Sequence, residues 1–285
     1  MRGRRRMLSK RLNQLHRRFE RWMYANRLSL PDFLGIGAQK CGTTWLYENL
    51  LVHPELYLPD YKEIEYFDKN FDKSLRWYGA LFATAGKKKK GEISPSYCYL
   101  SKEQILFLRT LMPEIRLILI LRNPVERSWS HAMHRIVTST GRQLEEIEDL
   151  EFYTLFEKKS FQKQGDYPTM LENWLEVFPR EQLFVGLFED IVHYPQRLLR
   201  QVFAHIGVSA EVDWSAFPFQ DVIVPPTGPD IATHDFGRGV RLATHRRTDT
   251  FMPARYRRFL TDLYQSDIKV LSDRYELPVE QWLEG

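Results

Sequence analysis

Cysteine is scarce in this sequence: Cys41 and Cys98 are the only two among 285 residues. Two thiols cannot build a disulfide scaffold, and these two lack the close pairing found in structural zinc sites. We therefore expect a protein of a reducing compartment, with a cytoplasmic location and no metal site.

Long apolar runs are also missing. The N-terminus lacks the apolar core of a signal peptide, and no stretch approaches the roughly 20 apolar residues that cross a bilayer. Any membrane contact would then be peripheral. Hydrophobic residues make up 43% of the chain and charged residues 27%, which is ordinary for globular proteins and excludes a disordered or fibrous class.

Excess positive charge is absent beyond the first 30 residues. Residues 1–30 hold ten of the 41 Lys and Arg and one acid, so the remainder carries 31 basic and 36 acidic residues. Nucleic-acid binding needs a broad basic face, which such a body does not provide. We expect no nucleic-acid partner, and an anionic ligand would have to bind at a focused site.

The basic N-terminal segment has helical periodicity. Apolar residues recur there at steps of three and four, and arginines fill the opposite face, as in a basic amphipathic helix. Such a helix either packs on the domain with solvated arginines or contacts an anionic lipid surface. We divide the chain into this extension, residues 1–30, and a single domain, residues 31–285.

Three short apolar, β-prone runs predict strands at residues 33–37, 116–121 and 183–187. Segments with helical periodicity lie between them, as at residues 101–112 and 167–178. Alternating strands and helices are typical of an α/β fold with a parallel, doubly wound sheet. Residues 116–121 are apolar throughout, which predicts a strand in the middle of that sheet.

The loop at residues 39–45 has the composition of an anion-binding site. It follows one predicted strand and opens a helix, where free backbone N–H groups and the helix dipole favour an anion. Gly42 allows close approach, Thr43 and Thr44 add hydroxyl donors, and Lys40 adds a cation. In the P-loop of nucleotide triphosphatases the glycine precedes the lysine, so the order found here disfavours a kinase.

Residues 39–46, Gln-Lys-Cys-Gly-Thr-Thr-Trp-Leu, resemble the 5′-phosphosulfate-binding loop of sulfotransferases that use 3′-phosphoadenosine 5′-phosphosulfate (PAPS). The resemblance implies a P-loop-like fold and PAPS as cofactor, with 3′-phosphoadenosine 5′-phosphate (PAP) as product. It assigns to the cofactor the residues Gln39, Lys40, Cys41, Gly42, Thr43, Thr44 and Trp45.

A second segment, residues 119–130, is similar to the 3′-phosphate-binding segment of the same family. The resemblance assigns Arg122 and Ser130 to the 3′-phosphate. Arg122 follows the predicted central strand, at the edge where open α/β sheets bind ligands, and arginine can hold a phosphate through two donors. Two such motifs in one chain make a chance match to either one less plausible.

Residues 62–68, Lys-Glu-Ile-Glu-Tyr-Phe-Asp, resemble the acceptor-side segment of the glycosaminoglycan-type and heparan-type sulfotransferases. The resemblance implies that Glu63 is the general base. Glu65 stands where heparan-type members often have histidine, and residues 92–97 match their Glu-Lys-Thr-Pro segment without its lysine. Both departures argue against a heparan-type acceptor.

Residues 245–253 occupy the place of the basic loop that closes over the cofactor phosphate in this family. Arg246 and Arg247 are the candidate cations of that loop, although its usual Lys-Gly-Arg form is absent. The tail, residues 256–282, resembles the family's last helix. The similarity thus covers most of the chain beyond residue 32.

These features predict an enzyme that transfers a sulfuryl group from PAPS to a hydroxyl or amine of an acceptor, with Lys40 and Glu63 as catalytic residues. The acceptor is a carbohydrate, a lipid or another small molecule. His131 and His134 are alternative bases, in the manner of the aryl-type enzymes, but we interpret them as structural. The competing hypotheses are a nucleotide kinase and a noncatalytic nucleotide-binding or membrane-adaptor protein.

Overall fold

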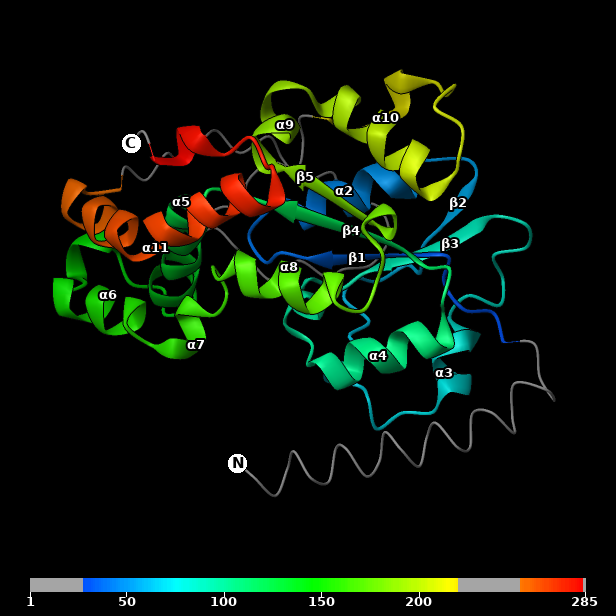
Figure 1. The fold of residues 1–285 in the computed structure, drawn as a ribbon, viewed down its shortest axis with the longest axis horizontal. Helices are drawn as coiled ribbons and strands as arrows, with labels where there is room; N and C mark the ends of the chain where they lie inside the picture. The colour runs from blue at the N-terminus through cyan, green and yellow to red at the C-terminus, as the bar shows by residue number, and fades with distance from the viewer. Residues whose placement is uncertain (1–27, 220–251, 284–285) are drawn as a thin grey trace.

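A computed structural model describes residues 28–219 and 252–283. Its centre is a five-stranded, wholly parallel sheet in the order β2-β3-β1-β4-β5 (Figure 1). The strands are β1 (Phe33–Gly37), β2 (Leu56–Tyr57), β3 (Lys89–Ile93), β4 (Arg116–Leu121) and β5 (Leu183–Leu187).

Helices connect the strands and cover both faces of the sheet. Those of the first half are α2 (Thr43–Leu51), α3 (Leu75–Ala80), α4 (Lys102–Leu111) and α5 (Pro124–Ala132). Those of the second half are α6 (Asp149–Phe156), α7 (Lys159–Gln162), α8 (Tyr167–Leu175), α9 (Phe188–His193), α10 (Pro195–Ile206) and α11 (Ala254–Tyr275). In Figure 1, α2, α9 and α10 lie on one face, and α3, α4 and α8 lie on the other.

The sequence explains why β1 and β4 form the middle of the sheet. All five residues of β1 are buried, and so are residues 117–121 of β4. A strand covered on both faces needs apolar residues at successive positions, which both runs supply. The chain passes from β1 to strands on one side and later, through β4, to strands on the other, so the two strands flank a topological switch point.

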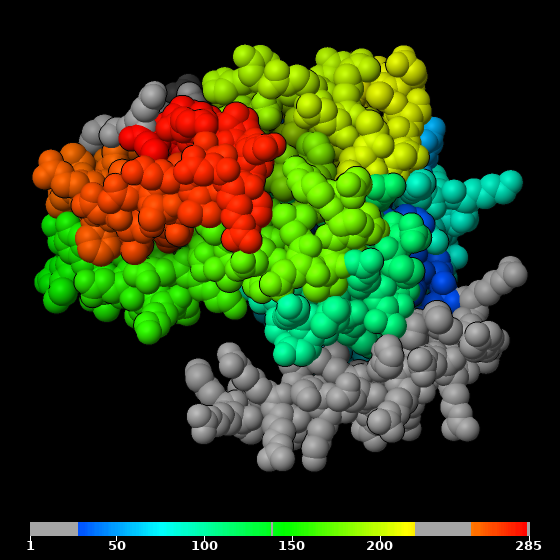
Figure 2. Space-filling model, viewed as in Figure 1, coloured from blue at the N-terminus to red at the C-terminus, as the bar shows by residue number. Residues whose placement is uncertain are grey.

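A helical lobe lies beyond the carboxyl ends of the strands. It contains α5, α6, α7 and α11, and the space-filling view shows α11 in orange and red against the green surface of that region (Figure 2). An aromatic stack joins the helices: the Trp129 ring centroid lies 5.3 Å from that of Phe152 and 5.5 Å from that of Tyr256. The stack thus extends the apolar core of the protein into the lobe, beside the strand ends.

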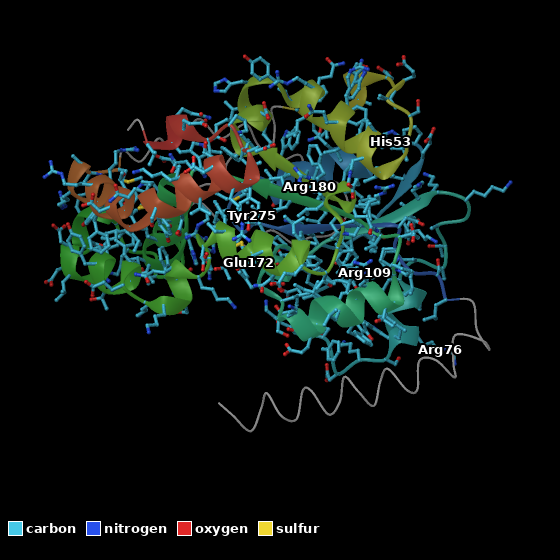
Figure 3. All side chains as sticks on the ribbon, viewed as in Figure 1. His53, Arg76, Arg109, Glu172, Arg180 and Tyr275 are labelled. Atoms are coloured by element: carbon cyan, nitrogen blue, oxygen red, sulfur yellow. The ribbon has the colours of Figure 1, made fainter. Side chains whose placement is uncertain are left out.

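Helix α11 also packs on α8, which connects the lobe to the sheet layer. The hydroxyl of Tyr275 donates to the carbonyl of Pro168 at 3.3 Å, and Arg274 pairs with Glu172 at 3.1 Å. Figure 3 labels Glu172 and Tyr275, which come from the two helices. The C-terminal helix thus helps to fix the start of α8, which contacts the site described below.

The structure confirms the α/β class and the three predicted strands. Two lysines of the run at residues 87–90 lie in a strand, because β3 begins at Lys89. The backbone N–H of Lys90 donates to the Asp32 carboxylate at 2.7 Å, and β2 pairs with Lys89 and Lys90 along the other side. Pairing on both sides thus holds two charged residues in a strand.

Within residues 28–219 and 252–283, none of the helices combines the length and apolar character needed to cross a membrane. Of the basic extension predicted at residues 1–30, residues 1–27 lie outside the described part of the chain. Its contact with a membrane surface remains a prediction.

Candidate active site

The loop between β1 and α2 is held against β4 and leaves the start of α2 open. The N–H of Ala38 donates to the carbonyl of Ile120 at 2.9 Å. Helix α2 begins after Gly42, whose φ of 85° is in the left-handed region, and neither a capping side chain nor a first-turn acid is present there. The helix therefore has backbone N–H donors and a positive dipole end available for an anion.

Gly42 is required at this position for two reasons. Its positive φ disfavours any residue with a side chain, and an added Cβ would lie 2.4 Å from Cδ1 of Ile191 in α9. Lys40 also has a left-handed conformation, with φ of 65°. Non-glycine residues are uncommon there and are often found at functional sites.

Lys40 lies among charges from three other segments. Burial and the positive charge of Arg122 lower the pKa of Lys40 to about 8, whereas Glu63 acts in the opposite direction. In residues 28–219 and 252–283, neither Lys40 nor Arg122 forms an ion pair with a carboxylate. The two cations are thus available to an anionic ligand.

Arg122 directly follows β4, at the carboxyl edge of the sheet. Its guanidinium lies 4.6 Å from the ring centroid of Phe188, and its carbonyl accepts a 2.9 Å hydrogen bond from the Tyr167 hydroxyl. Ser130 lies in the last turns of α5 and is half-buried. Helix α5 starts just after Arg122. Pro124 occupies its first position, and the side chain of the Asn123 cap accepts a hydrogen bond from the N–H of Val125.

The remaining loop residues differ in their exposure. Thr44 is exposed and Gln39 is half-buried, whereas Cys41 and Trp45 are fully buried. The Cys41 thiol lies 3.5 Å from the Tyr167 hydroxyl, and burial raises its pKa. The indole N–H of Trp45 donates to the carbonyl of Phe219 at 2.9 Å. The side chains of Cys41 and Trp45 are therefore engaged by the protein itself.

Glu63 lies close to the loop through its neighbour Lys62. The Lys62 Nζ is 3.8 Å from Oε1 of Glu63 and donates to the hydroxyls of Thr43 and Thr44 at 3.1 and 3.2 Å. Burial raises the pKa of Glu63, while Lys62 opposes that shift. The acceptor-side motif indicates no role for Lys62, although this residue directly precedes Glu63.

Arg127 is a second residue that the sequence analysis missed. It is fully buried, and within the described ranges no carboxylate pairs with it. Its Nη2 donates to Ser128 at 2.8 Å and its Nη1 to Gln164 at 3.4 Å, while its Nε lacks a partner. Its charge also lowers the pKa of Lys40. The lobe thus adds a fixed positive charge behind the anion loop.

The alternative bases on α5 and its extension are poorly suited to proton abstraction. Burial lowers the pKa of His131 to about 3, and Arg127 and Lys40 reinforce the shift. The His131 ring stacks on Phe161 with centroids 5.0 Å apart. Burial and Lys40 also lower the pKa of His134. Such weak bases favour the interpretation of both histidines as structural.

Glu92 occupies a buried network near the candidate base. Its carboxylate accepts hydrogen bonds from the hydroxyls of Tyr78 and Tyr97, both at 2.8 Å, and of Ser94 at 2.6 Å. The Ser94 hydroxyl in turn accepts from the N–H of Glu65 at 2.9 Å. Burial raises the pKa of Glu92 to about 6. The network thus fixes the backbone two residues after Glu63.

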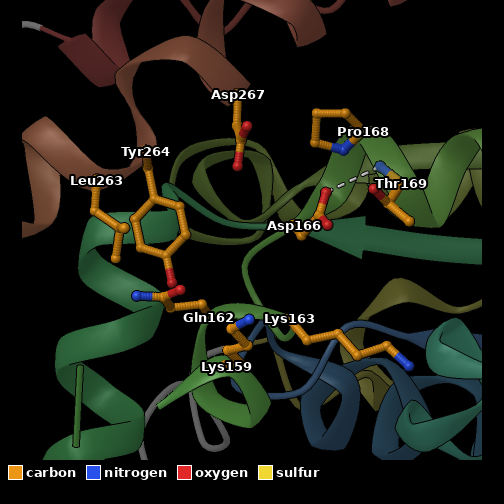
Figure 4. A pocket seen from close by; sticks show the side chains of 9 residues that line it. All are labelled: Lys159, Gln162, Lys163, Asp166, Pro168, Thr169, Leu263, Tyr264 and Asp267. Atoms are coloured by element: carbon orange, nitrogen blue, oxygen red, sulfur yellow. Dashed lines mark hydrogen bonds between the residues drawn. The ribbon is translucent and has the colours of Figure 1, made fainter. Parts of the chain in front are cut away.

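A hollow of about 510 Å³ lies between α7, α8 and α11 (Figure 4). Lys159, Lys163, Asp166 and Asp267 are among the side chains that line it, and Asp166 accepts a 3.1 Å hydrogen bond from the N–H of Thr169. Among the residues that the structure describes, none of those proposed for cofactor or base lines this hollow. Arg246 and Arg247 lie outside the described residues, so their assignment remains a prediction.

The comparison with known families agrees with this geometry. Residues 30–220, more than half of the chain, match the family described as the sulfotransferase domain. The chain belongs to the sulfotransferase family. The kinase and adaptor hypotheses are therefore not favoured for this sulfotransferase.

Curated relatives include enzymes that modify heparan sulfate. The bifunctional heparan sulfate N-deacetylase/N-sulfotransferase 4 of Mus musculus is 28% identical over 207 residues, which cover 65% of this chain and 23% of the relative. The heparan sulfate glucosamine 3-O-sulfotransferase 3B1 of Mus musculus is 29% identical, over 68% of this chain and 50% of the relative. The chain thus spans half or less of the length of these relatives.

Solved sulfotransferases share the fold. The enzyme from Alicyclobacillus acidocaldarius has a TM-score of 0.65 and 22% identity, over 90% of this chain and 99% of that one. A mouse sulfotransferase in complex with PAP has a TM-score of 0.50 and 14% identity, over 84% and 85% of the two chains. At these identities the similarity concerns the arrangement of the sheet and helices.

Proposed function

We propose that this sulfotransferase transfers a sulfuryl group from PAPS to a hydroxyl or amine of a carbohydrate acceptor and releases PAP. One observation carries the proposal: the uncapped start of α2 lies beside two cations, Lys40 and Arg122, that have no carboxylate partner in the described ranges. The complex of the mouse relative with PAP supports the cofactor, and the heparan sulfate relatives support a carbohydrate acceptor.

The residues at the site suit a ligand with two separated anionic groups. The loop N–H groups of residues 39–45, the Lys40 ammonium and the hydroxyls of Thr43 and Thr44 would hold the 5′-phosphosulfate. Gln39, Cys41 and Trp45 would contribute their backbone N–H groups. Arg122 and Ser130, which follow the neighbouring strand, would hold the 3′-phosphate.

When bound, PAPS supplies an activated sulfuryl group whose S–O bond to phosphate breaks as the bond from sulfur to the acceptor forms. Glu63 accepts the proton that the acceptor hydroxyl or amine loses. Lys40 and the loop N–H groups donate to the phosphate oxygen that keeps the electron pair of the broken bond. Each positioned donor of this kind stabilises a transition state by about 3 kcal/mol.

Burial of the site supports these roles. Glu63 has a raised pKa, so it is a stronger base than an exposed carboxylate, yet its proximity to Lys62 keeps the ionised form accessible. The lowered pKa of Lys40 shows that its cation is only weakly compensated by the protein. An anion in the loop would supply the missing compensation.

The proposal is tested by transfer from labelled PAPS to two matched polysaccharides, one with free glucosamine amines and one with those amines acetylated. Label on the first alone would indicate N-sulfation, and label on both would indicate a hydroxyl acceptor. Glu63→Gln should lower transfer to either polysaccharide by about a hundredfold or more, while PAP binding persists. Absence of both PAP binding and acceptor-dependent PAP release would contradict the proposal.

A further inference from the structure

Lys62 joins the acceptor-side segment to the anion loop. Its side chain is 14% exposed, and its Nζ lies within hydrogen-bond distance of the hydroxyls of Thr43 and Thr44, at 3.1 and 3.2 Å. The nearest Glu63 oxygen is more distant, at 3.8 Å. The two hydroxyls, and not the carboxylate, are thus the close partners of this ammonium group.

The direction of these hydrogen bonds has a chemical consequence. An ammonium group can only donate, so the oxygens of Thr43 and Thr44 both accept from Lys62. A hydroxyl that accepts through its oxygen keeps its own proton for another acceptor. Because an anion accepts but does not donate, this is the orientation that an anion-binding loop requires of its threonines.

We propose that Lys62 is a positioning residue that orients the Thr43 and Thr44 hydroxyls as donors to the sulfuryl-bearing group and holds Glu63 beside them. The inference rests on the proposed function, because it concerns the same cofactor site. The Lys62 side chain then orients the two hydroxyls that donate to the sulfuryl-bearing group and also fixes the position of the base, Glu63. Contact of the Lys62 ammonium with the bound anion is not required.

The surroundings of Lys62 favour a role in binding over a role in stability. Burial lowers the pKa of Lys62 to about 8, and the carboxylates of Glu63 and Glu48 only partly oppose that shift. A buried cation with weak compensation stabilises the fold little or not at all. Lys69, in the same segment, offers the contrast: its side chain is 67% exposed and pairs with Glu65 at 2.7 Å.

The test combines Lys62→Met with the double variant Thr43→Val/Thr44→Val, and measures PAP affinity by calorimetry and turnover by PAP release. Lys62→Met should weaken PAP binding about tenfold and lower kcat about a hundredfold, with an unchanged unfolding midpoint. In the double-valine background, Lys62→Met should change PAP affinity less than twofold, because the partners that it orients are gone. Lys69→Met is the matched control and should change neither quantity.

The outcomes separate this inference from the proposed function. If the unaltered protein binds no PAP, the proposed function fails and this inference fails with it. If it binds PAP and Lys62→Met has no effect, or has the same effect with and without the threonine hydroxyls, only the positioning role is overturned. A lower unfolding midpoint with unchanged kcat would likewise show that Lys62 is merely structural.

Discussion

The hydroxyl of Tyr167 donates a 2.9 Å hydrogen bond to the carbonyl oxygen of Arg122 and lies 3.5 Å from the Cys41 thiol. Tyr167 is the first residue of α8, so one buried side chain touches both halves of the proposed cofactor site. Helix α8 therefore fixes the position of the loop after β1 relative to the end of β4.

Tyr167→Phe should raise the Kd for PAP and lower the free energy of unfolding by about 1 kcal/mol, because the Arg122 carbonyl loses its donor. Calorimetry and urea denaturation measure the two effects. Tyr275→Phe removes a similar bond to the carbonyl of Pro168, away from the site. An equal rise in Kd in that control would contradict the proposed role of Tyr167.

Lys40→Ala should lower kcat by about a hundredfold or more without lowering the free energy of unfolding. Lys40 is a largely buried cation without a close carboxylate among the described residues. Its removal therefore leaves no carboxylate without its ion-pair partner. Turnover and thermal unfolding should be measured on one preparation. Full turnover by a folded Lys40→Ala protein would remove Lys40 from the mechanism.

The pH profile of kcat/KM should be bell-shaped. Glu63 must be ionised to accept a proton, and burial raises its pKa above 4.5, so the acid limb should lie above that value. Lys40 and Lys62 must both be protonated, and burial lowers the pKa of each to about 8, which places the alkaline limb near pH 8. Glu63→Gln should retain only residual activity, and the pH profile of this variant should lack the acid limb. An acid limb that persists unchanged in this variant would exclude Glu63 as the base.

Glu92 should make stability depend on pH. Its folded-state pKa of about 6 exceeds the ordinary value of 4.5, so the folded protein holds this proton more tightly than the unfolded chain. The stabilisation is then complete below pH 4.5 and is lost as pH rises through 6, by about 2 kcal/mol. Urea denaturation measures the free energy of unfolding of the unaltered protein and of Glu92→Gln. The difference between the two proteins should change by that amount between pH 4.5 and 7.5. A stability difference that is independent of pH would contradict it.

The sequence was sufficient to predict the middle of the sheet. The runs that form β1 and β4 are apolar because both faces of each strand are covered, and the run that forms the edge strand β5 is also apolar, although two of its residues are half-buried. Such runs are visible directly in the sequence. The two strands on the other side of β1 were harder to predict: β2 has two residues, and β3 begins with lysines whose pairing partners come from distant segments. Pairing between segments that are far apart in the chain leaves no pattern in the local sequence.

The sequence suggested candidate site residues only where a motif places chemistry on one short segment. The loop around Lys40 and the strand end at Arg122 are of that type. The contact of Lys62 with Thr43 and Thr44 joins segments 18 and 19 residues apart through the fold of the acceptor-side segment. Arg127 could not be predicted either, since a buried arginine without a carboxylate has no local sequence pattern that separates it from a solvated one.

The most direct test of the account is calorimetric titration with PAP and with adenosine 5′-phosphate, which lacks the 3′-phosphate, for the unaltered protein and for Arg122→Ala. The account predicts that the unaltered protein prefers PAP and that Arg122→Ala weakens PAP binding about ten- to a hundredfold while affecting the other ligand little. Equal affinity of the unaltered protein for both ligands, or an Arg122→Ala protein that keeps the full preference, would contradict the proposed cofactor site.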